Sequence, residues 1–259
     1  MVRVVPHKKH FDELLKLEKI ESKFFWSSFI FTVIIQIINM ISKESFHLDR
    51  LSNGVSICLL IILFVFDIKI DKYRQSAEKE RKLDFIDNSL GSKYCVNTSE
   101  NYYDNDDLDN GIYKLLINLY QNAFDTKNNL ELMIRKSEKY SLLCFALLAV
   151  LAILGLFNSA IVVSILQLFL SKEILMKKFT LENYLKNVTE VYNEITTLLS
   201  CGLDIKKMKD INAKVIILLI KYESSIASSK IELDERIFKE NKVKWDREWL
   251  EIKEKYCQK

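Results

Sequence analysis

The stretch FFWSSFIFTVIIQIINMI, residues Phe24–Ile41, holds no charged side chain in eighteen positions and decides the predicted fold. A second uncharged run covers Leu51–Phe66 (LSNGVSICLLIILFVF), and a third, Tyr140–Ser171, extends over thirty-two positions. A helix needs about 20 apolar residues, with a lower limit near 17, to cross the hydrocarbon core of a bilayer. We therefore predict four membrane-spanning helices in two hairpins, with the third run divided at Gly155–Asn158.

Two other interpretations of these runs stay open. Leu51–Phe66 is shorter than the lower limit and crosses only if the helix continues through Asp67, so a three-span protein is one alternative. Buried helices of a large helical core also read as apolar runs, which makes a protein without spans the other alternative. Lys23 and Lys43 frame the first run as anchors at two interfaces would, which favours the four-span prediction.

The rest of the chain also favours helices. Only five glycines and one proline occur in 259 residues, so residues that break helices are scarce. Leucines and isoleucines recur at spacings of three and four through 112–139 and again through 172–199. The prediction is an all-α membrane protein with a helical cytosolic domain.

The chain then divides into five parts. The predicted parts are a cytosolic amphipathic lead at 1–23, a membrane hairpin at 24–67, a cytosolic helical insert at 68–139 with a loop at 88–111, a second membrane hairpin at 140–171, and a cytosolic helical tail at 172–259. Lysine and arginine are concentrated before the first run, after the second and after the third. This bias places both termini and the insert in the cytoplasm of a multi-pass protein.

Residues that carry common chemistry are few. The three histidines lie at His7, His10 and His47, and the five cysteines are widely scattered with no metal-ligand spacing. The acidic segment Asp104–Gly111 lacks the ligand spacing of a calcium-binding EF-hand loop. A net charge of +3 does not indicate binding to a nucleic-acid polymer. We therefore predict no enzymatic activity, catalytic residue, metal or cofactor.

Uncharged polar residues inside the runs are the clearest candidates for function. In lipid such side chains seek hydrogen bonds between helices, so they either line an aqueous path or hold an oligomer together. The candidates for these pore-lining or interhelical roles are Gln36, Asn39, Ser56, Asn158, Ser164 and Gln167. Trp245 and Trp249, four positions apart in the tail, indicate packing in a core or an interface.

A charged predicted helix follows the second uncharged run and leads into Arg81-Lys82-Leu83-Asp84-Phe85-Ile86-Asp87. A second predicted helix, Tyr113–Lys139, contains asparagine and leads into the third uncharged run. This layout resembles the SMODS-associated four-transmembrane family, pore-forming effectors of bacterial antiphage systems of the CBASS type. The resemblance covers most of the layout and little of the identity, and the chain lacks the Trp- and Pro-containing step often found after the charged stretch.

The resemblance implies an oligomeric protein of the bacterial inner membrane that receives a signal through a cyclic oligonucleotide, or through a nucleotide-signalling protein, and then permeabilises or depolarises that membrane. Candidates for sensing are Arg81, Asp87, Tyr102 and Tyr103. The alternative is a membrane-anchored helical scaffold or signalling protein. Such a protein would dock a cytosolic partner through Asn88–Gly111 or through the Trp245 and Trp249 face.

Overall fold

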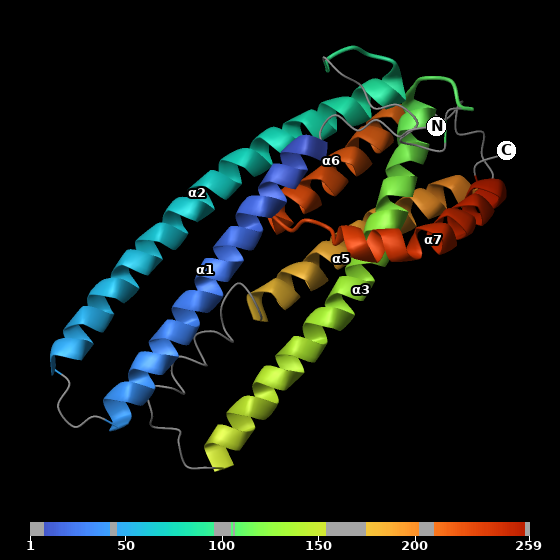
Figure 1. The fold of residues 1–259 in the computed structure, drawn as a ribbon. Helices are drawn as coiled ribbons and strands as arrows, with labels where there is room; N and C mark the ends of the chain where they lie inside the picture. The colour runs from blue at the N-terminus through green and yellow to red at the C-terminus, as the bar shows by residue number, and fades with distance from the viewer. Residues whose placement is uncertain are drawn as a thin grey trace.

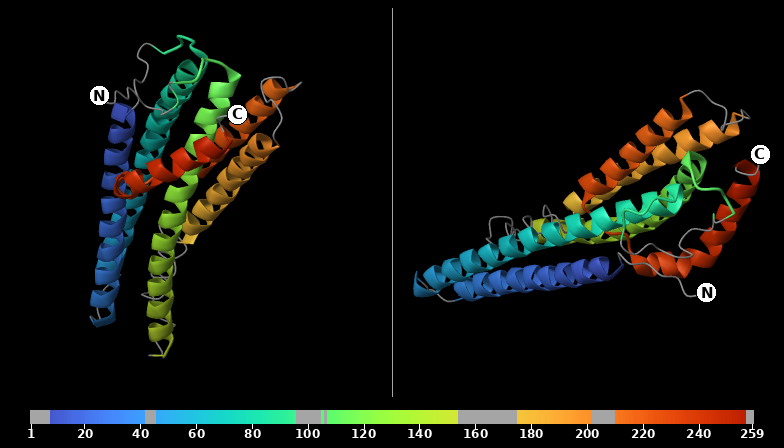
Figure 2. Two further views of the ribbon diagram at one scale, coloured as in Figure 1. Left: turned by 90° about the vertical axis from the view of Figure 1, so that its right-hand side faces the viewer. Right: turned by 90° about the horizontal axis from the view of Figure 1, so that it is seen from above.

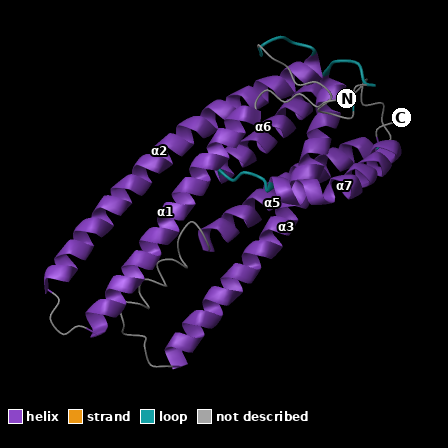
Figure 3. Ribbon diagram, in the orientation of Figure 1, coloured by secondary structure: helices purple, strands orange, loops and turns teal. Residues whose placement is uncertain are grey.

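The computed structural model describes residues 8–41, 46–95, 105, 107–153, 175–201 and 210–256, and every regular element within them is an α-helix (Figure 1, Figure 3). The all-helical part of the prediction is therefore confirmed for the described residues. The scarcity of glycine and proline explains this, because nothing in the long periodic segments interrupts the backbone hydrogen bonds of a helix.

Three long helices give the molecule its elongated shape. α1 spans Lys8–Ile41, α2 spans Phe46–Leu90 and α3 spans Ile112–Ile153. α1 and α2 lie side by side as an antiparallel hairpin, and α3 runs beside that hairpin (Figure 1, Figure 2). The lower parts of all three helices extend beyond the other helices. We call these parts, residues 24–41, 46–66 and 140–153, the arm.

Three shorter helices pack around the upper part of α3. α5 spans Leu175–Ser200, α6 spans Ile211–Ser229 and α7 spans Glu235–Tyr256. α5 packs along α3 and α6 along α5, while α7 crosses α3 (Figure 2). Residues 230–234 join α6 to α7, and Lys230 ends α6 in a left-handed conformation with φ 51°.

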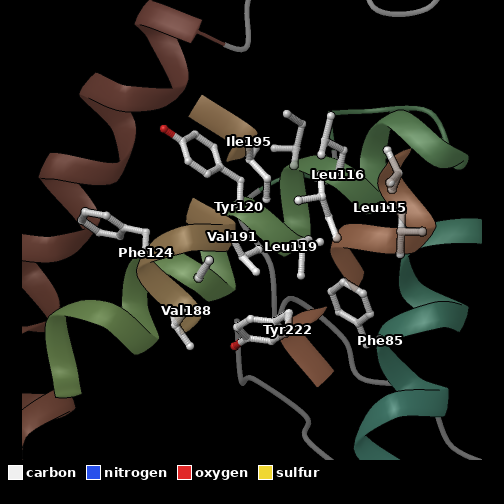
Figure 4. Close-up of a cluster of buried hydrophobic side chains, with 14 of the residues drawn as sticks. Phe85, Leu115, Leu116, Leu119, Tyr120, Phe124, Val188, Val191, Ile195 and Tyr222 are labelled. Atoms are coloured by element: carbon white, nitrogen blue, oxygen red, sulfur yellow. The ribbon is translucent and has the colours of Figure 1, made fainter. Parts of the chain in front are cut away.

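The main apolar core lies where α3, α5, α6 and α7 meet (Figure 4). Leu116, Leu119 and Tyr120 of α3 are fully buried there, and so are Val188 and Ile195 of α5. These positions belong to the apolar stripes predicted for 112–139 and 172–199, which are therefore confirmed. A second, smaller cluster joins Phe25 and Phe29 of α1 to Leu148 of α3 and Leu175 of α5.

The predicted packing role of the two tail tryptophans is also confirmed. Trp245 is 4% exposed and Trp249 is 1% exposed. The Trp249 ring lies edge-on to Tyr120 with a centroid separation of 5.4 Å, and at 6.1 Å from Phe124. Both indoles are therefore buried within the chain's own core, which leaves little of either side chain on the surface for a partner to contact.

The four-span prediction requires correction. Within the described residues, no helix combines the length and the apolarity that a membrane crossing needs. This finding overturns the four-transmembrane fold and the multi-pass inner-membrane location. The second half of the third run, residues 154–171, lies outside the described residues.

The physical reason lies in the difference between an uncharged stretch and an apolar helix. The first run includes Ser27, Ser28 and Thr32, whose hydroxyl donates to the Ser28 carbonyl at 3.0 Å. The first and second runs are also only parts of longer helices, and the remaining turns of those helices, α1 and α2, are charged. The absence of charged residues from a run therefore does not by itself predict a helix that crosses a membrane.

Large apolar side chains remain exposed along the arm. Examples are Ile34 at 49%, Ile61 at 57% and Phe64 at 64% on the hairpin, and Leu142 at 71% on α3. Large apolar side chains that remain exposed in such numbers are typical of a region that contacts another molecule.

Candidate functional site

A cavity of about 520 Å³ lies above the arm, where the hairpin meets the core helices. All six described helices and the 230–234 connection contribute to its wall. Its size is within the range of about 300–1,000 Å³ that is usual for small-molecule sites. We call it the hairpin cavity. Its lining includes Arg81, Asn129, Tyr184, Tyr222 and Glu232.

Arg81 of α2 is the strongest electrostatic link across this cavity. Its Nη2 lies 2.9 Å from Glu78 Oε2 on its own helix and 2.5 Å from Glu223 Oε2 on α6. The three side chains are 13–18% exposed. Burial opposes the charge of Arg81, but Glu223 and Glu78 hold its pKa well above the usual value. Arg81 therefore stays charged and ties the hairpin to α6.

A second charged cluster lies beside it. Arg74 of α2 pairs with Glu18 of α1, and its Nε lies 3.6 Å from Glu232 Oε1 in the 230–234 connection. Lys230 Nζ, from the same connection, lies 2.7 Å from Asp71 Oδ2 of α2. Ion pairs thus link the hairpin to the region between α6 and α7.

Glu232 has an unusual environment within this cluster. Burial, together with the nearby charges of Glu18 and Glu78, raises the pKa of Glu232 to about 7, although Arg74 and Arg81 oppose the shift. The carboxyl therefore changes its protonation state near neutral pH, at a point where the hairpin meets the core.

The wall opposite the hairpin carries neutral hydrogen-bonding groups. Thr126 Oγ1 and Tyr222 OH lie 2.9 Å apart, and the Tyr222 hydroxyl donates to the Asn122 carbonyl at 3.4 Å. Asn129, 1% exposed, donates through Nδ2 to the Asp234 carbonyl at 3.1 Å. Burial raises the pKa of Tyr184 well above its usual value, so this phenol stays neutral.

Asp87 organises the first turn of the 88–111 segment. Asp87 Oδ1 accepts from Ser92 Oγ at 2.6 Å and from the Tyr94 amide at 3.0 Å, while Oδ2 accepts from the Cys95 amide at 2.7 Å. Burial works against the charged carboxylate, but these hydrogen bonds lower the pKa of Asp87. Asp87 therefore has a structural role at the end of α2.

The structure brings together few of the residues predicted from sequence. Arg81 lines the hairpin cavity, whereas Asp87 anchors the loop and Tyr102 and Tyr103 lie outside the described residues. The side chains of Gln36, Asn39 and Ser56, and the whole of Asn158, Ser164 and Gln167, also lie outside what the structure describes.

Sequence reasoning missed Thr126, Asn129, Tyr222 and Glu232. A signal existed for two of them, because Thr126 and Asn129 are polar positions on the same buried face of α3 as Ala123 and Leu130. Polar residues on an otherwise apolar stripe indicate a buried hydrogen-bonding site. Glu232 had no such signal, since its environment is created by residues of α1 and α2 that are distant in sequence.

Comparisons with family models, with curated proteins and with solved structures found no match to this chain.

Proposed function

We propose that this chain is a signal-responsive helical protein in which a small molecule occupies the hairpin cavity and changes the position of the α1–α2 hairpin. The observation that carries the proposal is the place of the cavity, between a hairpin and a core that are linked there by ion pairs from Arg74, Arg81 and Lys230. A ligand that contacts both sides binds one relative position better than another, and so shifts the population toward it.

The role we propose is binding and transmission rather than catalysis. The described lining contains no histidine or cysteine, and two of its carboxylates, Glu232 and Glu235, pair with cations of the hairpin. The family resemblance implies a cyclic oligonucleotide as the signal, so that class of ligand is included in the test below.

The test measures the distance between α2 and α7 in the full chain. Spin labels at Ser76 and Lys244, both exposed, report this distance in a background without the five native cysteines. We expect the distance distribution to shift when Arg74 and Arg81 are both changed to Gln, and when a binding ligand is added. The matched control is Lys127→Gln, which breaks the Lys127–Glu131 pair within α3 and should leave the distribution unchanged.

Two probe ligands are added separately to the labelled protein: the cationic polyamine spermidine and the cyclic dinucleotide cyclic di-AMP. The proposal would be contradicted if the distance distribution stayed unchanged in the double variant and with each probe. Circular dichroism confirms that each variant keeps its helix content, so that a shift is not mistaken for unfolding.

A second proposed function concerns the arm. We propose that copies of this chain associate through its exposed apolar side chains, because surface of this kind is typical of contact regions. Sedimentation velocity should show an oligomer that Ile61→Asn with Phe64→Asn weakens and that Ile216→Asn, on exposed α6 surface, does not. A monomer at every concentration would overturn this second proposal.

A further inference from the structure

The charge of the hairpin cavity distinguishes between classes of ligand. Six carboxylates line it, against four cationic side chains. The carboxylates are Asp12, Glu78, Asp84, Asp125, Glu232 and Glu235. Asp84 is 4% exposed, so part of this acidic lining is shielded from solvent. Electrostatic interactions are stronger in such an environment than in bulk water.

Every one of the four cations already has a carboxylate partner. Arg81 lies 2.5 Å from Glu223, and Lys8 lies 3.6 Å from Glu235. The remaining two pairs, Lys239 with Glu235 and Lys242 with Asp246, are both at 2.9 Å. Two lining carboxylates are paired as well, Glu232 with Arg74 and Glu78 with Arg81, so a ligand of either charge shares a partner that is already paired. The excess of carboxylates over cations in the lining then favours a cationic ligand over a polyanion.

An independent feature of the wall also calls for a hydrogen-bond donor. Asn129 is 1% exposed, and its Oδ1 accepts no hydrogen bond from any residue that the structure describes. Its Nδ2 is used by the Asp234 carbonyl, so the side chain is held in place with its acceptor unpaired. Buried acceptors are almost always paired, because an unpaired one costs about 1–3 kcal/mol.

Asp125 lies one helical turn before Asn129 and lines the same cavity. Residues four positions apart share a helix face, so a carboxylate and an amide oxygen are presented together on α3. Phe238 adds an aromatic ring, over which Lys242 Nζ already lies at 5.7 Å from the centroid. This contact shows that the wall accommodates an ammonium group against that ring.

We infer that the hairpin cavity binds a small organic cation carrying amino N–H donors, which pair with Asn129 Oδ1 and with the neighbouring carboxylates of the wall. This inference rests on the proposed function and names the class of its signal. Such a ligand would bridge α3 and the 230–234 connection by contacting Asp125 and Glu232.

The experiment is calorimetric titration of the full-length protein with spermidine and, separately, with cyclic di-AMP in 150 mM salt, which weakens nonspecific binding to surface charges. At pH 8, above the pKa of Glu232, Asp125→Asn and Glu232→Gln should each weaken spermidine binding by about tenfold or more, because each replaces a carboxylate acceptor by a neutral amide. Glu248→Gln, a carboxylate on α7 outside the cavity, should leave binding unchanged. Circular dichroism and the unfolding midpoint establish that every variant is folded.

The results separate this inference from the proposed function. Spermidine affinity that is equal in all variants indicates binding elsewhere on the surface and overturns the inference. Binding of cyclic di-AMP, weakened by Arg81→Gln, overturns the cationic class but supports a signal-responsive protein. Absence of binding by either probe also overturns the inference, and the spin-label distances then decide the proposed function on their own.

Discussion

Arg81 of α2 and Glu223 of α6 form an ion pair with 2.5 Å between Nη2 and Oε2, although 142 positions separate them in the chain. The pair joins the hairpin to the core beside the hairpin cavity. Removing one partner of a largely buried pair leaves the other charge without compensation, which costs far more than the pair itself contributes.

Arg81→Gln should therefore lower the free energy of unfolding by about 3 kcal/mol. Glu78 and Glu223 would then both lose Arg81, and Glu223 would keep only Lys82, whose Nζ lies 3.7 Å from its Oε2. Urea unfolding of Arg81→Gln, Glu223→Gln and the double variant gives the coupling energy between the two residues. We expect the double variant to be more stable than Arg81→Gln, and strict additivity of the two single changes would contradict a direct interaction.

Glu232 should make stability depend on pH in a defined window. Its pKa is raised from 4.5 to about 7 in the folded protein. The folded state therefore binds more protons than the unfolded state between these values, and its stability falls as pH rises from about 4.5 to about 7. The loss is at most about 3 kcal/mol, because one pKa unit corresponds to about 1.4 kcal/mol.

The test compares urea unfolding at several pH values for the wild type and for Glu232→Gln. The variant should lose this part of the pH dependence and be at least as stable as the wild type at pH 8. Glu190→Gln, on exposed α5 surface, is the control and should follow the wild-type curve. Identical curves for wild type and Glu232→Gln would show that another group is responsible.

Gly91 ends α2 in a conformation that an L side chain adopts at a cost. Its φ is 72°, its amide donates to the Asp87 carbonyl at 2.8 Å, and an added Cβ would lie 2.6 Å from Asn110 Nδ2. Gly91→Ala should lower stability by about 1–2 kcal/mol. Gly54→Ala, inside α2 with nothing within 4 Å of the added Cβ, should instead raise stability by about 0.5–1 kcal/mol. Thermal unfolding midpoints that move in the same direction for both variants would contradict this assignment.

Trp249 should be among the most sensitive core positions. It is 1% exposed and packs against Tyr120 and Phe124, so truncation removes aromatic contacts from both α3 and α7. Trp249→Ala should cost about 3–5 kcal/mol in unfolding free energy. Trp26→Ala, which truncates a 40% exposed tryptophan on α1, should cost much less. Comparable losses in the two variants would be inconsistent with the core described above.

Much of the fold could be predicted because helix formation is governed by local spacing. Apolar residues recur at spacings of three and four positions through Leu115–Leu130 and Leu181–Leu199, and the helix faces that they form are buried. Uniform apolarity, by contrast, does not show which face of a helix is buried. Val215–Ile220 is uniformly apolar, yet only Val215 and Leu218 are buried, while Ile216, Ile217 and Ile220 are about half exposed.

The candidate site was largely unpredictable for a related reason. Arg81 was singled out from its local sequence, but its partner Glu223 lies on a different helix. The raised pKa of Glu232 depends on charges from α1 and α2, and no spacing in the sequence indicates that these segments meet.

The sequence by itself determined that this chain is helical and which stripes of α3 and α5 are buried, because periodicity of 3.6 residues and the absence of breakers act within one helix. Only the tertiary structure decided that Trp245 and Trp249 face the core, that the first two uncharged runs belong to longer, partly charged helices, and that Arg81, Asn129 and Glu232 share one cavity. These outcomes depend on how separate helices pack against one another, and that packing balances burial of apolar surface against the pairing of charges from distant parts of the chain.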